Sequence, residues 1–365
     1  MTRAALLLMM AAPVFAADLP RQAAGKYAVT LRLPEGGLIA AEENEIEFRV
    51  EDTSRPDPVI GFSPVIRATP SAVIDMPAMP GMPKFTATAH PEGVPGDYGI
   101  HPTFAHGGTH RLRIEAHPPA GETFTVEFPL EVADVSQTAG RKPLPPRYRL
   151  EVTAKSPRVG QPVEIRLLLR DRENGVVRDF ESMHEAYMHL VIVRRDLTHF
   201  AHVHPELAAD GAFRIPHIFT AGGDYRLFAD SAPRGAGSQI LSASLRVDGK
   251  REVKAPLRAY PTKVGMTPHD GIVPVGKSVV IGFILRDGAT GRNVSDLEPY
   301  LGVQGHLMLV HEDGATFVHS HPADDRSMDF LARFPKPGVY RGWLQFQRAG
   351  QVETAEFLFR AEAGR

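Results

Sequence analysis

Hydrophobic and polar residues alternate along most of this chain in short runs. The segments KYAVTLRL, EIEFRVED and VEIRLLLRD switch between apolar and polar residues about every second position, the period of a strand with one buried face. The 33 Gly and 32 Pro punctuate these runs and favour turns over long helices. With turns about every 8–12 residues, the pattern predicts an all-β chain of three tandem immunoglobulin-like antiparallel β-sandwich domains.

Connectors and an internal repeat set the predicted domain boundaries. We expect domains at residues 24–135, 148–248 and 262–362, with a Pro- and Gly-rich connector after the first. The strand VEIRLLLRD of the second domain recurs as VVIGFILRD in the third, so these two domains are repeats. The first domain is a more distant copy, in which EIEFRVED takes the place of VEIRLLLRD.

One histidine-rich stretch occurs twice. It reads HLVIVRRDLTHFAHVHP over residues 189–205 and HLMLVHEDGATFVHSHP over residues 306–322. Three histidines keep their places at a constant offset of 117 residues. These pairs are His189 with His306, His202 with His319, and His204 with His321. Side chains that both copies keep need a physical reason, and metal coordination is one.

Each stretch is predicted to form a β-hairpin that gathers its three histidines. A four-residue turn after Arg194 would place His189 opposite His204 and Val191 opposite His202, on one sheet face. Three imidazoles about 2.0–2.1 Å from one ion is a common Zn or Cu arrangement. His199 and His311 should point to the opposite face. His184 and Met188 are further candidate ligands in the second domain alone. The alternative is that all these histidines are packing residues hydrogen-bonded to the backbone.

The first domain carries a separate methionine signal. Met76, Met79 and Met82 are spaced by three in DMPAMPGMP, where prolines exclude both a helix and a central strand. Thioether sulfur suits Cu(I), so these residues, with His90, form a candidate Cu(I) site. In the predicted alignment the cluster falls where the first hairpin strand begins in the other copies. The alternative is a loop whose methionines cover the core. His101, His106, His110 and His117 are further candidate ligands.

Composition limits the classes of molecule that the protein is expected to bind. The formal net charge is −2 and no basic stripe appears, which argues against nucleic acid. Residues 1–16 resemble a signal peptide, with Arg3 before a short apolar run and Val14-Phe15-Ala16 as a cleavage site. No later run is long enough to span a membrane. We therefore expect a periplasmic or secreted protein, and the absence of Cys leaves His, Met and oxygen ligands for any metal.

Two segments resemble known families. The Met-Pro segment followed by GDYGIHPTFAHGGTHRLRI resembles the exported YtkA-like/FixH-like β-sandwich family, although His110 stands where an aromatic residue is commoner. The HL…HxHP hairpins of the second and third domains are similar to secreted bacterial proteins that handle copper or other heavy metals. These resemblances imply copper handling.

Three functions are consistent with the sequence. The first is a non-catalytic copper-binding protein, for Cu⁺ or Cu²⁺ with zinc as the alternative, that buffers the ion or delivers it to a periplasmic transport protein or cuproprotein. One ion would bind in each histidine hairpin and another at the methionines. The second is a structural or protein-interaction scaffold with no metal role. The third, a hydrolytic zinc enzyme, is disfavoured because the second hairpin lacks an acid matching Glu185 or Glu206 of the first.

Overall fold

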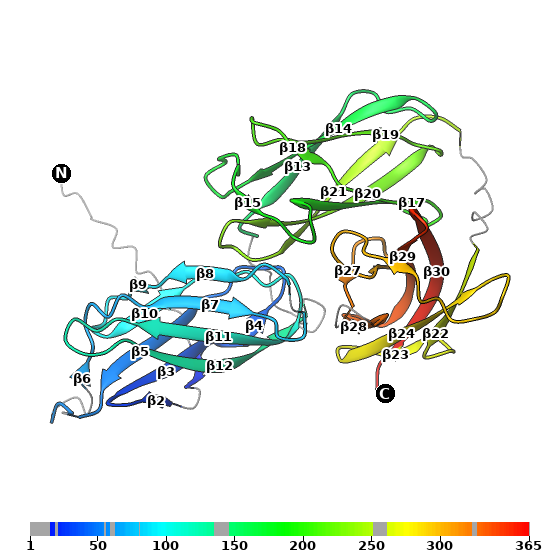
Figure 1. The fold of residues 1–365 in the computed structure, drawn as a ribbon. Helices are drawn as coiled ribbons and strands as arrows, with labels where there is room; N and C mark the ends of the chain where they lie inside the picture. Colours follow the sequence, from blue (N-terminus) through cyan, green and yellow to red (C-terminus); the bar gives the residue numbers. More distant parts are fainter. Residues whose placement is uncertain are drawn as a thin grey trace, which may run out of the picture.

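The computed structural model describes residues 15–18, 21–54, 56–58, 63–79, 81–134, 146–250, 261–322 and 327–364. Over these ranges the chain is all-β and forms three tandem immunoglobulin-like β-sandwiches, as the alternation of residues predicted (Figure 1). Within the same ranges, no helical segment has the length and apolar character that a membrane crossing requires. Residues 1–14 of the predicted signal peptide lie outside the described residues.

The first domain packs two sheets around one core. One sheet runs in the order β1 (Phe15–Asp18), β3 (Tyr27–Pro34), β5 (Ile46–Asp52), β10 (Asp97–Ile100) and β9 (His90–Pro91), with β2 (Gln22–Ala24) on β3 and β6 (Ser63–Pro64) on β5. The other runs in the order β4 (Leu38–Ile39), β12 (Phe124–Ala133), β11 (Gly108–Ala116), β7 (Ser71–Asp75) and β8 (Phe85–Thr88). Every second side chain of β12 is buried, because only one face of this strand meets the core.

The second and third domains repeat one architecture. In the second, one sheet is β13 (Arg149–Ala154), β14 (Pro162–Arg170), β19 (Phe213–Ile218) and β18 (Glu206–Leu207). Its other sheet is β15 (Phe180–Glu181), β20 (Gly223–Pro233), β16 (Met188–Arg194) and β17 (Phe200–Val203), with β21 (Gln239–Val247) on β20. In the third, one sheet is β22 (Thr262–Thr267), β24 (Ser278–Asp287) and β28 (Asp329–Arg333). Its other sheet is β23 (Ile272–Pro274), β30 (Gln351–Glu362), β29 (Gly338–Arg348), β26 (His306–His311) and β27 (Phe317–Ser320), with β25 (Leu297–Glu298) on β29.

The histidine-bearing sheets of the second and third domains pack against each other. Every residue of β16 and of β26 is buried, because each strand has a core on both faces. Leu190 and Ile192 of β16 point into the core of their own domain, whereas Val191 and Val193 join a core shared with the third domain. Trp343, the single tryptophan of the chain, stacks on Phe200 across this interface with ring centroids 4.5 Å apart.

The first domain contacts both of the others. The Thr86 amide of β8 donates to the Gly235 carbonyl at 2.8 Å, next to an isolated bridge between Phe85 and Ala236. Asp134, after β12, accepts from Arg333 of the third domain at 2.7 Å. These contacts bring one end of the first domain to the junction of the second and third (Figure 1).

The position of the methionine cluster differs from the predicted alignment. By their order in the sheets, β7 and β8 correspond to the hairpin strands β16 with β17 and β26 with β27. The methionines follow β7 and form the connection to β8, so they occupy the hairpin turn and not the start of the first strand. The prolines explain the difference, because a residue without an amide hydrogen ends the strand at Asp75 and lengthens the turn.

Candidate metal centre

Both histidine hairpins have the predicted register. Val191 lies opposite His202, and the equivalent Met308 lies opposite His319. The turns close where expected, since the Arg194 amide donates to the His199 carbonyl and the His311 amide donates to the Thr316 carbonyl, both at 3.0 Å. Side chains on opposed and alternate positions share a face. The three histidines of each hairpin therefore project from the face that meets the other domain.

The two predicted triads merge into one cluster between the domains. Ligand nitrogens of His189, His202 and His204 lie within 4.8 Å of one another, and so do those of His189, His306 and His319. The second group takes one histidine from the second domain and two from the third. The first group is the triad predicted for the first hairpin. The second group joins histidines of both hairpins, so an ion shared between the domains is an alternative to a separate ion in each hairpin.

The ring centroids of four histidines are spaced like the corners of a tetrahedron. The six distances between the ring centroids of His189, His202, His306 and His319 all lie between 5.3 and 5.8 Å. The ligand nitrogens themselves lie within 4.8 Å of one another in two groups of three, both of which contain His189. We call His189, His202, His306 and His319 the histidine quartet.

Distances between nitrogens within each hairpin agree with coordination of an ion. His189 Nδ1 lies 3.2 Å from His202 Nε2, and His306 Nδ1 lies 3.4 Å from His319 Nε2. Two nitrogens bound to one tetrahedral ion at about 2.0–2.1 Å are about 3.3 Å apart. Each domain contributes one Nδ1 and one Nε2, so an approximate twofold relation runs through the centre of the quartet.

Groups around the quartet fix the tautomers of its four rings. His189 Nε2 donates to the Met183 carbonyl at 2.9 Å, and the equivalent His306 Nε2 donates to the Tyr300 carbonyl at 3.1 Å. A carbonyl can only accept, so in the neutral rings the proton sits on Nε2 and the lone pair on Nδ1 faces the centre. Because each carbonyl holds the protonated nitrogen of its ring, the other nitrogen carries no proton and can bind an ion.

The other two rings are held across the domain interface. His202 of the second domain donates from Nδ1 to Gln345 Oε1 of the third at 2.9 Å, and the Gln345 amide is oriented by donating to Thr354. Reciprocally, His319 of the third domain donates from Nδ1 to the Asp230 carboxylate of the second at 3.0 Å. The neutral His202 thus also presents Nε2 as a lone pair, which lies 3.2 Å from both His189 Nδ1 and His204 Nε2 and can accept from His204 or bind a cation. His319 Nε2 lies 3.4 Å from His306 Nδ1.

Burial keeps several of these imidazoles in the neutral form that binds metals. Burial lowers the pKa of His189 to about 3 and the pKa of His204 to about 4. It also brings the pKa of His202 and His306 well below the usual range. Burial would raise the pKa of Asp230, but hydrogen bonds from His319 and Ser238 lower it below its usual value. One buried carboxylate therefore stands close to the neutral rings of His189, His202 and His306.

Three further histidines flank the quartet. The rings of His204 and His321 lie 4.6 and 4.4 Å from those of His202 and His319, at equivalent places in the two domains. His184 lies against His321 with centroids 3.9 Å apart, and the buried nitrogens of His321 and Nε2 of His184 have no hydrogen-bond partner. The other predicted extra ligand, Met188, is buried in the core of its own domain and faces away.

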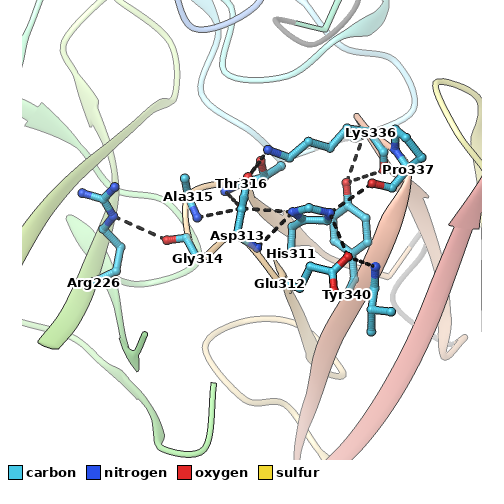
Figure 2. Close-up of polar contacts among 11 residues, drawn as sticks. Arg226, His311, Glu312, Asp313, Gly314, Ala315, Thr316, Lys336, Pro337 and Tyr340 are labelled. Carbon is cyan, nitrogen blue, oxygen red and sulfur yellow. Dashed lines mark hydrogen bonds and ion pairs between the residues drawn. The ribbon is translucent and has the colours of Figure 1, made fainter. Parts of the chain in front are cut away.

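The two histidines expected on the opposite face lie outside the cluster. Figure 2 shows His311 closing the second hairpin turn, with its Nε2 3.1 Å from the Pro337 carbonyl and its Nδ1 accepting from the Asp313 amide at 3.2 Å. Both its nitrogens are therefore occupied. His199 bonds to the neighbouring Thr198 hydroxyl at 2.9 Å. His199 and His311 thus lie on the face opposite to that of the six histidines that converge, as their positions along the strands predict.

The three methionines line one small pocket of about 50 Å³, but His90 is not among its lining residues. His90 belongs to β9, which pairs with β10 in the opposite sheet, and it contacts Glu92 and stacks on His101. His106 and His110 line the methionine pocket in its place. Sequence reasoning assigned the wrong histidine because it did not foresee that the chain changes sheets between β8 and β9.

Sequence reasoning also missed Asp230 and Gln345. They pair with His189 and His306 respectively, each on the strand next to the histidine-bearing one. A signal was present: aligning GGDYRLFAD with PGVYRGWLQF on their shared Tyr-Arg places both polar residues at one position of an otherwise apolar strand.

The first domain resembles a known protein family. A YtkA-like family model matches residues 21–115, which confirms the predicted resemblance of the first domain. No curated protein matches the chain. A likeness of the histidine hairpins to copper-handling proteins does not appear among the matches and stays a prediction.

Solved structures resemble the chain only loosely. A tetra-tandem repeat from the extending region of a large adhesion protein is 11% identical, with 88% of this chain and 71% of that one covered and a TM-score of 0.22. A putative membrane-anchored protein from Corynebacterium diphtheriae is 12% identical, with 93% and 92% covered and a TM-score of 0.21. Scores this low carry no argument about function.

One family model covers both histidine domains. It matches residues 146–248 and again residues 262–363, which confirms that the second and third domains are copies of one unit. Because these matches span more than half of the 365 residues, the chain belongs to the family described as Domain of unknown function (DUF8832).

Proposed function

We propose that this is an exported, non-catalytic metal-binding protein whose histidine quartet holds one ion between the second and third domains. The observation that carries the proposal is the set of four buried imidazoles whose ring centroids have tetrahedral spacing, each with one nitrogen held by a neighbouring group and the other left for an ion. Arrangements with an oriented outer shell of this kind are typical of metal sites.

The geometry and the chemistry of the donors favour a d¹⁰ ion. Tetrahedral nitrogen ligands suit Zn²⁺ and Cu⁺, whereas Cu²⁺ prefers tetragonal sites. The methionine pocket next to the junction supports Cu⁺, because thioether sulfur is a soft ligand. We therefore propose Cu⁺ as the ion, with Zn²⁺ as the competing outcome of the test. Coordination by all four rings would close the coordination shell, which fits holding an ion rather than catalysis.

Titration of the protein with Cu⁺, Cu²⁺ and Zn²⁺ tests this function. We expect one tightly bound Cu⁺ at the junction, lost in the His202→Asn/His319→Asn variant, which removes one ligand from each domain. His199→Gln is the matched control, because His199 lies in the first hairpin but outside the cluster. Affinities of wild type and the double variant that agree within error would refute the proposal, and tighter binding of Zn²⁺ would reassign the ion.

A second candidate is a structural scaffold, and one observation favours it. The histidines lie in an interface that already has an apolar core, with Trp343 on Phe200 and Phe228 on Phe317. The cluster could then serve domain packing alone. In that case His202→Asn/His319→Asn would change the stability of the protein. The wild type and this variant would bind metal with the same affinity.

A further inference from the structure

A cavity lies at the junction of all three domains. It has a volume of about 380 Å³, and its wall joins the methionine turn of the first domain to the histidine cluster. Met76, Met79 and His106 line it from the first domain, Phe228 from the second and His319 from the third. His319 is a member of the quartet, so the cavity reaches the proposed metal centre.

The same side chains of the first domain also line the methionine pocket. Met76, Met79 and His106 border both spaces, and Met82 borders the pocket alone. Two backbone hydrogen bonds hold the turn, because the Met79 amide donates to the Met76 carbonyl and the Met82 amide donates to the Met79 carbonyl. All three methionine side chains border the methionine pocket.

His106 supplies an unsatisfied nitrogen at this place. Its Nε2 is out of contact with solvent and has no hydrogen-bond partner among the residues that the structure describes. Burial lowers the pKa of His106, and both Asp230 and His319 are close enough to influence that pKa. A neutral imidazole with a free, buried nitrogen beside three thioethers is a set of soft donors.

We propose that Met76, Met79, Met82 and His106 form a second site, specific for Cu⁺, which passes the ion through the shared cavity to the histidine quartet. The proposal rests on the metal role of the quartet. Thioether and neutral imidazole are both uncharged ligands, so the exchange breaks Cu–S bonds and forms Cu–N bonds without moving a proton or an electron. The methionine site would thus bind Cu⁺ first and transfer it to the histidine quartet.

The test measures how much Cu⁺ the protein binds, through which atoms, and how fast. Anaerobic titration against a coloured Cu⁺ chelator should give two equivalents in the wild type, with sulfur ligands in the X-ray absorption spectrum of the doubly loaded protein. Met76→Leu/Met79→Leu/Met82→Leu should bind one equivalent through nitrogen alone. Its quartet should load severalfold more slowly but reach the same final occupancy. Leucine conserves side-chain volume, and Met266→Leu on β22 is the matched control.

The outcomes separate this proposal from the function on which it rests. If the triple variant keeps two equivalents and the loading rate of the wild type, the methionine site is refuted while the quartet stands. If His202→Asn/His319→Asn and the wild type both bind one ion through sulfur, the quartet is refuted and no transfer takes place. Loss of the sulfur signal in His106→Asn, with nitrogen-bound copper kept, would support the assignment of His106.

Discussion

Lowering the pH should open the metal-free interface between the second and third domains. The pKa of His189 is about 3 and those of His184 and His204 are about 4 in the folded protein, all lowered chiefly by burial. An exposed histidine titrates near 6.5. Above about pH 6.5 neither state binds these protons and stability is unaffected. Below about pH 6.5 these histidines become protonated in the open state but stay neutral in the closed state. The stability of the closed state relative to the open state therefore falls as the pH falls.

The magnitude follows from the same values. Each pKa unit corresponds to about 1.36 kcal/mol, so at pH 5.0 one such histidine destabilises the closed state by about 2 kcal/mol. Three of them contribute about 6 kcal/mol, a large part of the stability of a typical domain. The closed interface should therefore be lost between about pH 6.5 and 5. A bound metal ion, which needs the neutral rings, should move the transition to lower pH.

Emission of Trp343 reports this opening. It is the single tryptophan, it is 1% exposed, and it stacks on Phe200 across the interface. We expect a red shift on acidification, with far-ultraviolet circular dichroism distinguishing domain opening from global unfolding. His321→Asn should reduce the proton uptake of the transition, and His117→Gln, an exposed position of the first domain, should not. Emission unchanged from pH 7.5 to 4.5 in the metal-free protein would refute the reasoning.

Three other substitutions test separate parts of the account. Trp343→Ala removes the largest side chain of the shared core and should lower the free energy of unfolding by about 3–5 kcal/mol in urea denaturation followed by circular dichroism, whereas a loss below about 1 kcal/mol would contradict a packed interface. Asp230→Asn keeps the shape but removes the carboxylate that holds His319, so metal affinity should fall about 10–100-fold in the chelator competition, and an unchanged affinity would exclude a role for this charge. Asp97→Asn weakens the ion pairs of the buried Asp97 with Arg32 and Arg49 and should destabilise the first domain by about 2 kcal/mol without changing metal stoichiometry, which calorimetry and titration check together.

The sequence predicted the hairpins because strand geometry is strict. A period of two residues decides which face each side chain takes, so the convergence of His189 with His202 and His204 followed from counting positions. What covers that face does not follow from the period. The uninterrupted apolar run of β16 was a sign that both its faces are buried, but it does not name the partner, which is the other repeat.

The remaining differences have local causes. Residues far apart in sequence, such as His202 and Gln345, meet only because two domains dock. The methionine turn was placed one strand too early, at the start of the first hairpin strand and not after it, and His90 was assigned to it although the chain passes to the other sheet at β9. Period and motif thus predicted the elements and one face of the site, while domain packing decided its final composition.

X-ray absorption at the metal edge tests the central claim most directly. Protein loaded with one equivalent of Cu⁺ or Zn²⁺ in the Met76→Leu/Met79→Leu/Met82→Leu background isolates the quartet. The account predicts four nitrogen ligands at about 2.0–2.1 Å, with the multiple-scattering pattern of imidazole and no sulfur. A spectrum of oxygen ligands without imidazole scattering, or one unchanged in His202→Asn/His319→Asn, would contradict it.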